Sequence, residues 1–143
     1  MAVARSHPVR TTQARSRVRL LPLADRPGAI AEARTLTADF LADVPDPMVV
    51  ADAVLLVSEL VGNALRHAGS PGDLLLARAD GLLRMEITDS SPRPPRPRPP
   101  QERDETGGLG LYLLARLAVR WGWYPLGPGK AVWCELRLPG RTR

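Results

Sequence analysis

Residues 90–107, SSPRPPRPRPPQERDETG, limit what this chain can fold into more than any other stretch. Proline has no backbone N–H to give to a helix or sheet, and dense charge opposes burial, so this segment cannot form a packed element. A loop this long inside a compact domain is usually a lid over a site or a disordered linker. Because 143 residues suit one domain, we expect a single folded unit over residues 17–138, with 90–107 as its lid. Residues 1–16 and 139–143 are expected to be tails.

The net charge of +5 does not indicate a folded surface that binds nucleic acid. Residues 1–19 contain five arginines and no acidic residue, so this segment accounts for the whole excess. The charge pattern therefore predicts a flexible basic tail and not a basic folded face, and nucleic acid is not the expected partner. Binding of nucleic acid or of an acidic partner through the arginine tail stays open as an alternative of a different class.

The cysteine content and the hydropathy predict a cytoplasmic protein with no membrane segment. Cys134 is the single cysteine, so an internal disulfide is excluded, and its place in an alternating segment favours a small buried residue over a nucleophile. We find no apolar stretch approaching the roughly 18–20 residues that cross a bilayer. The N-terminal sequence MAVARSHPVR also lacks the apolar run of a signal peptide.

Apolar periodicity and turn residues predict the order strand, helix, helix, hairpin, lid, helix, hairpin. Asp46 is a natural N-cap with Pro47 at the first helical position, and Asp80-Gly81 is typical of a two-residue hairpin turn. The helix after the lid is apolar on nearly all sides, which predicts burial. This order favours the α+β class, a two-layer sandwich whose mostly antiparallel sheet carries helices on one face. The expected strands are 17–23, 73–79, 82–88, 121–126 and 130–138, and the expected helices are 29–43, 47–67 and 111–120.

The second expected helix has an apolar side and a polar row. Glu59, Asn63 and Arg66 lie at positions i, i+4 and i+7, so they share one stripe along the helix. An asparagine offers a neutral oxygen to Mg²⁺, and a carboxylate one turn earlier can hold a water or accept a hydroxyl proton. A solvated polar flank is the alternative interpretation. The apolar stripe, which should face the sheet, contains Ala53, Leu56, Val57, Leu60, Val61 and Ala64.

Two further features flank the expected lid. Asp89 ends the strand before it, where a carboxylate can accept a hydrogen bond from an exocyclic amine such as that of adenine, or can simply start a turn. After the lid, Gly107-Gly108-Leu109-Gly110 precedes a helix, and such glycines let backbone N–H groups approach an anionic ligand closely. A flexible hinge is the alternative interpretation. The order of these features along the chain is more specific than any one of them.

In this order the motifs resemble those of the GHKL, or histidine-kinase-like, ATPase superfamily. The segment SELVGNALRHAG resembles the N box of these proteins, Asp89-Ser90-Ser91-Pro92 occupies the place of the first glycine box, and GGLGLYLL resembles the second. Together with the closing GKAVWCEL, these segments are most similar to the stand-alone anti-sigma factor/serine-protein kinase branch. The resemblance covers roughly residues 17–138 and implies the Bergerat ATP-binding fold.

The resemblance implies ATP and Mg²⁺ as ligands and gives roles to individual residues. Asn63 would coordinate Mg²⁺ between the phosphates, and Glu59 would orient or deprotonate the attacking group as the catalytic residue. Asp89 would bind the adenine amine, and Gly108 and Gly110 would cradle the phosphates. The complete set of site residues implied in this way is Glu59, Asn63, Arg66, Asp89, Gly108, Leu109, Gly110 and Leu111.

One departure from the family pattern leaves two functions open. The first glycine box usually reads Asp-x-Gly, but its third position here is Ser91, whose Cβ would lie where the backbone passes close to the base. The first function is an anti-sigma factor that phosphorylates a serine of an anti-anti-sigma-type protein and alternates between that protein and a sigma factor. The second is a catalytically weak or inactive ATP-binding module that regulates a partner. The resemblance also admits a homodimer.

Overall fold

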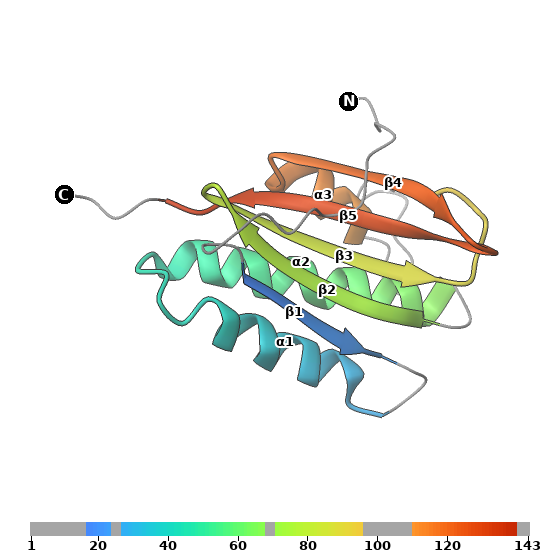
Figure 1. Cartoon of the computed structure of the whole chain (residues 1–143), viewed down its shortest axis with the longest axis horizontal. Helices are drawn as coiled ribbons and strands as arrows, with labels where there is room; N and C mark the ends of the chain where they lie inside the picture. Colours follow the sequence, from blue (N-terminus) through green and yellow to red (C-terminus); the bar gives the residue numbers. More distant parts are fainter. Residues whose placement is uncertain (1–16, 24–26, 68–70, 96–109, 140–143) are drawn as a thin grey trace.

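Five strands and three helices follow one another in the predicted order (Figure 1). The computed structural model describes residues 17–23, 27–67, 71–95 and 110–139. The expected tail 1–16, residues 140–143 of the expected tail 139–143, and the lid from residue 96 onward lie outside the described residues. The elements are β1 (Arg17–Pro22), α1 (Ala29–Phe40), α2 (Pro47–His67), β2 (Pro71–Ala79), β3 (Leu82–Asp89), α3 (Gly110–Leu117), β4 (Arg120–Leu126) and β5 (Gly129–Arg137).

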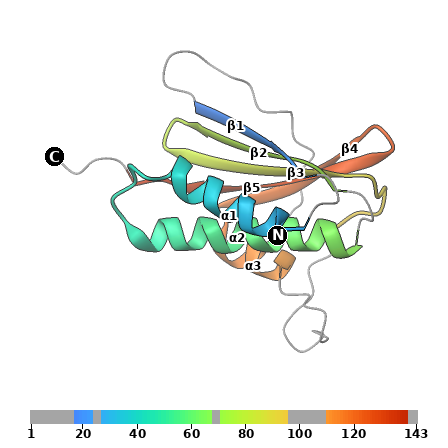
Figure 2. The ribbon, with the colours of Figure 1, turned by 90° about the horizontal axis from the view of Figure 1, so that it is seen from below.

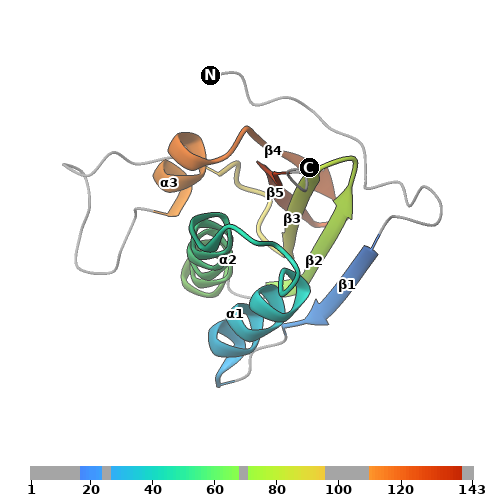
Figure 3. The same ribbon diagram turned by 90° about the vertical axis from the view of Figure 1, so that its left-hand side faces the viewer.

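The strands form one antiparallel sheet in the order β1-β2-β3-β5-β4. All three helices lie on the same face of this sheet, with α2 in the middle (Figure 3). The view in Figure 2 shows the same two layers, with the sheet on one side and the helices on the other. The predicted α+β two-layer sandwich is therefore confirmed.

The helix α2 is the central element of the core. All six residues of its predicted apolar stripe are buried, each 2% exposed or less. The helix begins as predicted, because the Asp46 carboxylate accepts a hydrogen bond from the backbone N–H of Met48 at 2.9 Å. By length and composition α2 is long and apolar enough to cross a bilayer. The prediction that no apolar stretch approaches the length of a membrane span is therefore wrong. Core helices pass the same test, and the packing of the apolar stripe of α2 on the sheet matches that role.

The central hairpin fixes the register of the sheet. Asp80 and Gly81 both have positive φ, 54° and 75°, which is the geometry of the tight turn predicted from this pair. Alternation along β3 then directs Leu83, Met85 and Ile87 toward the helices, and all three are buried. Cys134 on the paired strand β5 is fully buried in the same core, as predicted, and this burial raises the pKa of its thiol.

Two predictions about the helices need correction. The first helix ends at Phe40 and not at residue 43, because residues 41–43 form a turn. The helix α3 ends at Leu117 and is not buried on all sides. Of its residues 112–117 only Leu114 is fully buried, and Leu117 is 37% exposed. A short helix packed on α2 through one side does not need apolar residues all round, so its composition overstated its burial.

The face of the sheet opposite the helices carries a cluster of charged and aromatic residues. The guanidinium of Arg84 lies 4.2 Å from the ring centroid of Trp133 and 3.1 Å from the carboxylate of Glu86. Trp133 and Glu86 are only 4% and 5% exposed. Burial and the neighbouring Glu86 raise the pKa of Tyr124 to about 12. Strand alternation identifies these positions as facing away from the helices, but it gives no sign that they are buried.

Candidate nucleotide-binding site

The polar row of α2 lies beside the core. Glu59 and Asn63 are half-buried and lie one turn apart. Within the described part of the chain, neither side chain has a hydrogen-bond partner. Arg66 is exposed and folds back along the helix, with its Nη1 3.1 Å from the place where a Cβ on Gly62 would stand. Of the three residues that helical spacing places in one row, Glu59 and Asn63 are therefore half-buried and Arg66 is exposed.

Asp89 is held by an ion pair that the sequence did not predict. The Lys130 ammonium donates a hydrogen bond to Asp89 Oδ1 at 3.0 Å and another to the Ser91 carbonyl oxygen at 3.2 Å. The Ser91 backbone N–H also donates to Asp89 Oδ1, at 2.8 Å. The side chains of Asp89 and Lys130 are 4% and 8% exposed. A buried charge is tolerated when it is paired and hydrogen-bonded, and this network supplies both.

The pair faces the helices. Asp89 and Lys130 are direct partners at the end of the β3–β5 ladder, so their side chains project from the same face of the sheet. Asp89 comes two residues after the core residue Ile87, and Lys130 two residues before Val132, which is also in the core. Strand alternation therefore directs the carboxylate and the ammonium toward the helical layer.

The end of β3 and the start of β5 lie in very close contact. A Cβ on Gly129 would fall on the carbonyl oxygen of Asp89 and would stand 2.7 Å from both the Asp89 carbonyl carbon and the Ser90 Cα. Only glycine fits at this position without displacing backbone. This contact brings Lys130 to Asp89. One signal in the sequence could have drawn attention to this position, because Lys130 is the single lysine beside nineteen arginines.

The second glycine motif is described only in part. Gly110 is the first residue of α3, so a helix starts where this motif predicts one. Gly108 and Leu109 lie outside the described residues, and of Leu111 only its helical backbone is described. The position of these groups relative to Asn63 and Asp89 stays a prediction.

These predicted groups come from neighbouring ends of the elements. In Figure 1 the C-terminal end of α2, the end of β3 and the start of β5 lie at the same end of the molecule. The contact between α2 and β3 agrees with this arrangement. The C-terminal half of α2, to which Glu59 and Asn63 belong, thus runs toward the end of the sheet that carries Asp89 and Lys130.

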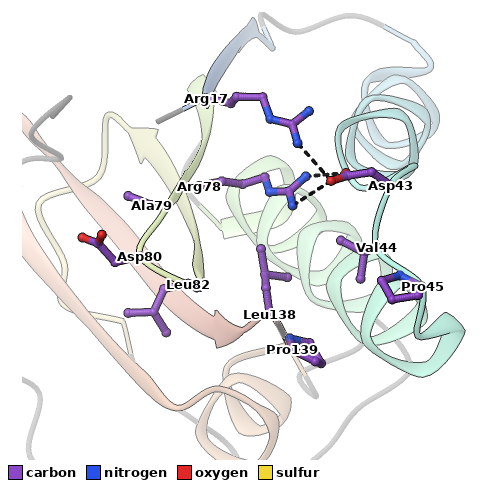
Figure 4. Close-up of a pocket in the computed structure, with 11 residues that line it drawn as sticks. Arg17, Asp43, Val44, Pro45, Arg78, Ala79, Asp80, Leu82, Leu138 and Pro139 are labelled. Carbon is purple, nitrogen blue, oxygen red and sulfur yellow. Dashed lines mark hydrogen bonds and ion pairs between the residues drawn. The ribbon is translucent and has the colours of Figure 1, made fainter. Parts of the chain in front are cut away.

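A pocket of about 390 Å³ lies at the other end of the sheet (Figure 4). Its lining includes Leu82, the first residue of β3, and an eight-residue strand separates this end from Asp89 by about 23 Å. At its rim Arg78 binds both oxygens of Asp43, at 2.6 and 3.2 Å, and Arg17 binds one of them at 3.1 Å. The hydrogen bond from Arg78 lowers the pKa of Asp43 to about 2. These contacts join β1 and β2 to the loop before α2, away from the predicted nucleotide site.

The residues present fit a nucleotide with its metal. Asn63 has an amide oxygen of the kind that Mg²⁺ accepts, with no hydrogen-bond partner among the described residues and with a carboxylate one turn away. Three or more His, Cys, Asp or Glu side chains do not gather anywhere in the described ranges. A magnesium ion held by one protein oxygen, phosphates and water needs no such cluster. That α2 and the end of β3 form a nucleotide site stays a prediction, and these are the side chains that would hold the nucleotide and its metal.

The chain belongs to the histidine kinase-like ATPase domain family, whose model matches residues 23–132. Its structure is similar to the crystal structure of the RsbU and RsbW domains of Rv1364c from Mycobacterium tuberculosis, with a TM-score of 0.63 and 20% sequence identity. That match covers 89% of this chain and 34% of the other, so this chain spans about a third of that protein's length. No protein of curated function matches the sequence significantly.

Proposed function

We propose that this protein binds ATP with Mg²⁺ and transfers the γ-phosphoryl group to a serine of a partner protein. The observation that carries this proposal is the half-buried pair Glu59 and Asn63, which has no described partner and lies in the half of α2 that runs toward the end of the sheet that bears Asp89. Membership of the histidine kinase-like ATPase family supports ATP as the ligand. The resemblance of the sequence motifs to the anti-sigma factor/serine-protein kinase branch supports an anti-anti-sigma-type protein as the partner and a sigma factor as the alternate one, and the similarity in fold to a structure that contains an RsbW domain agrees with this choice.

The side chains account for the steps of phosphoryl transfer. The serine hydroxyl oxygen forms a bond to the γ-phosphorus, the bond from that phosphorus to the β–γ bridging oxygen breaks, and ADP leaves with the electron pair. The hydroxyl proton passes to the carboxylate of Glu59. Asn63 would hold Mg²⁺, which supplies charge neutralisation on the phosphates when bound. Asp89 would accept the hydrogen bond of the adenine amine and fix the base at the end of β3.

A substitution in α2 tests the enzymatic step. Glu59→Gln keeps the shape and the hydrogen-bonding capacity of the side chain but removes the base. Purified protein is incubated with Mg-ATP and each anti-anti-sigma-type protein encoded in the same genome, and phosphoserine is detected by mass spectrometry. We expect transfer by the wild type, loss of transfer in Glu59→Gln with ATP binding retained, and full transfer by Asp52→Asn, which removes a carboxylate from the same helix. No transfer by the wild type to any of these proteins would overturn the kinase proposal.

An ATP-binding regulatory module without turnover is the second candidate. The observation that favours it is the Ser91 backbone N–H bound to Asp89 Oδ1, which closes the loop where the family's Asp-x-Gly pattern has glycine. In this case both the wild type and Glu59→Gln would bind ATP, and neither would transfer phosphate. The nucleotide would then stabilise one conformation that the partner protein recognises.

A further inference from the structure

The buried ion pair between Asp89 and Lys130 leaves hydrogen-bonding groups available on both residues. The two hydrogen bonds to the carboxylate are both made to Oδ1, and among the described residues none donates to Oδ2. An ammonium has three N–H bonds, and two of those of Lys130 are given to Asp89 and to the Ser91 carbonyl oxygen. Among the described residues, one acceptor of Asp89 and one donor of the adjacent Lys130 therefore remain without a partner.

This pair is placed where it can contact a bound base, and it differs from an exposed ion pair on the protein surface. Both side chains are nearly completely buried, and both project from the helix-covered face at the end of the sheet toward which the C-terminal half of α2 runs. A lysine that served only solubility would extend into water. Here the ammonium is fixed by two acceptors, so its third N–H has a fixed direction and little entropy to lose when a ligand binds.

The Watson–Crick edge of adenine matches this arrangement. Its exocyclic amine is a donor and its neighbouring N1 is an acceptor, whereas guanine presents an oxygen and a protonated N1 at the same two places. An acceptor beside a donor can therefore satisfy both groups of adenine at once. A carboxylate alone can satisfy only the amine.

We propose that Lys130 is a specificity-determining residue that donates a hydrogen bond to N1 of adenine while Asp89 accepts one from the amine. This inference rests on the proposed binding of ATP and adds a second protein group that reads the base. It also gives Ser91 a part, because its carbonyl oxygen orients the ammonium. This contact uses the backbone of residue 91, so the serine in place of the family's glycine leaves it intact.

Nucleotide analogues test the contact atom by atom. Binding of ATP, of 1-deaza-ATP, which lacks the N1 acceptor, and of purine riboside triphosphate, which lacks the amine, is measured by calorimetry with Mg²⁺. The proteins are the wild type, Lys130→Met, which keeps the apolar stem but cannot donate, and Arg137→Met. Arg137→Met removes one exposed charge from the far end of β5 and is the control for net charge.

We expect the wild type and Arg137→Met to prefer ATP over 1-deaza-ATP by about 10- to 100-fold, the usual strength of a hydrogen bond from a charged donor. In Lys130→Met this preference should fall below about twofold, whereas the preference for ATP over purine riboside triphosphate should persist. Equal loss of affinity for ATP and 1-deaza-ATP in Lys130→Met would show that Lys130 only positions Asp89, and would overturn the proposal.

The wild-type protein alone can also refute the inference, whether or not Lys130→Met folds. If it binds ATP and 1-deaza-ATP equally well, no group donates to N1, and the inference is wrong while ATP binding stands. If it binds none of the three nucleotides, the proposed function fails as well. The two failures are therefore distinguishable.

Discussion

Replacement of Gly129 by alanine should separate the two strand ends that form the base site. The added Cβ would overlap the Asp89 carbonyl oxygen and stand 2.7 Å from the Asp89 carbonyl carbon and the Ser90 Cα. These are backbone atoms, so restoring ordinary contact requires the strands to move apart by on the order of 1 Å. Overpacking of this kind costs about 1–3 kcal/mol, and disruption of the last pair of the ladder adds about 0.5–1.5 kcal/mol. We expect Gly129→Ala to lower the free energy of unfolding by about 1.5–4.5 kcal/mol.

Thermal unfolding followed by circular dichroism measures this loss as a fall in Tm of roughly 5–18 °C for a domain of this size. Gly127→Ala is the matched control, because it lies in the preceding turn and no atom lies within 4 Å of its added Cβ. Its φ of 57° leaves only left-handed backbone strain, which costs about 1 kcal/mol. Equal falls in Tm for the two variants would contradict our explanation, which is that glycine is needed at position 129 because the backbone of Asp89 and Ser90 lies so close.

Three further predictions concern the framework around the site. The Arg78 hydrogen bond lowers the pKa of Asp43 from 3.8 to about 2. This ion pair therefore stabilises the fold fully above pH 3.8, and its stabilisation is lost as the pH falls through the folded-state pKa of about 2. Asp43→Asn should therefore flatten the dependence of Tm on pH between about pH 4 and pH 2, and an unchanged slope would contradict this. Asp46→Ala removes the N-cap of α2 and should cost about 1 kcal/mol in urea unfolding, whereas no loss would mean that the cap is not formed in solution. Leu114→Ala should cost about 2–4 kcal/mol and Leu117→Ala less than about 1 kcal/mol, because only the first side chain is buried, and similar losses would place α3 differently on α2.

Most of the fold could be predicted because its signals are local. The tight turn at Asp80-Gly81, the cap at Asp46 and the apolar stripe of α2 each depend on residues a few positions apart. These features gave the order of the elements and the class of the fold. The length of α3 was overestimated because residues 118–120 are as compatible with a helix as with the start of β4, and only pairing with β5 decides between them.

The candidate site could be predicted only within single elements. Helical spacing placed Glu59 and Asn63 together, but no local pattern joins Asp89 to Lys130, which are separated by 41 positions and meet through strand pairing. The cluster around Arg84 was missed for a similar reason. Alternation predicts which face of the strand its side chain uses, and burial there depends on Trp133 of a different strand.

The central claim is that α2 and the end of β3 form an ATP site. Calorimetric titration of the folded protein with Mg-ATP and Mg-GTP, repeated with Asp89→Asn and Asn63→Ala, tests it most directly, with a thermal melt of each variant to verify folding. We predict binding of ATP but not of GTP, at least about tenfold weaker in Asp89→Asn because a charged hydrogen-bond acceptor is lost, and weakened in Asn63→Ala only when Mg²⁺ is present. No binding of ATP to the folded wild-type protein, or equal binding by the wild type and Asp89→Asn, would contradict the claim.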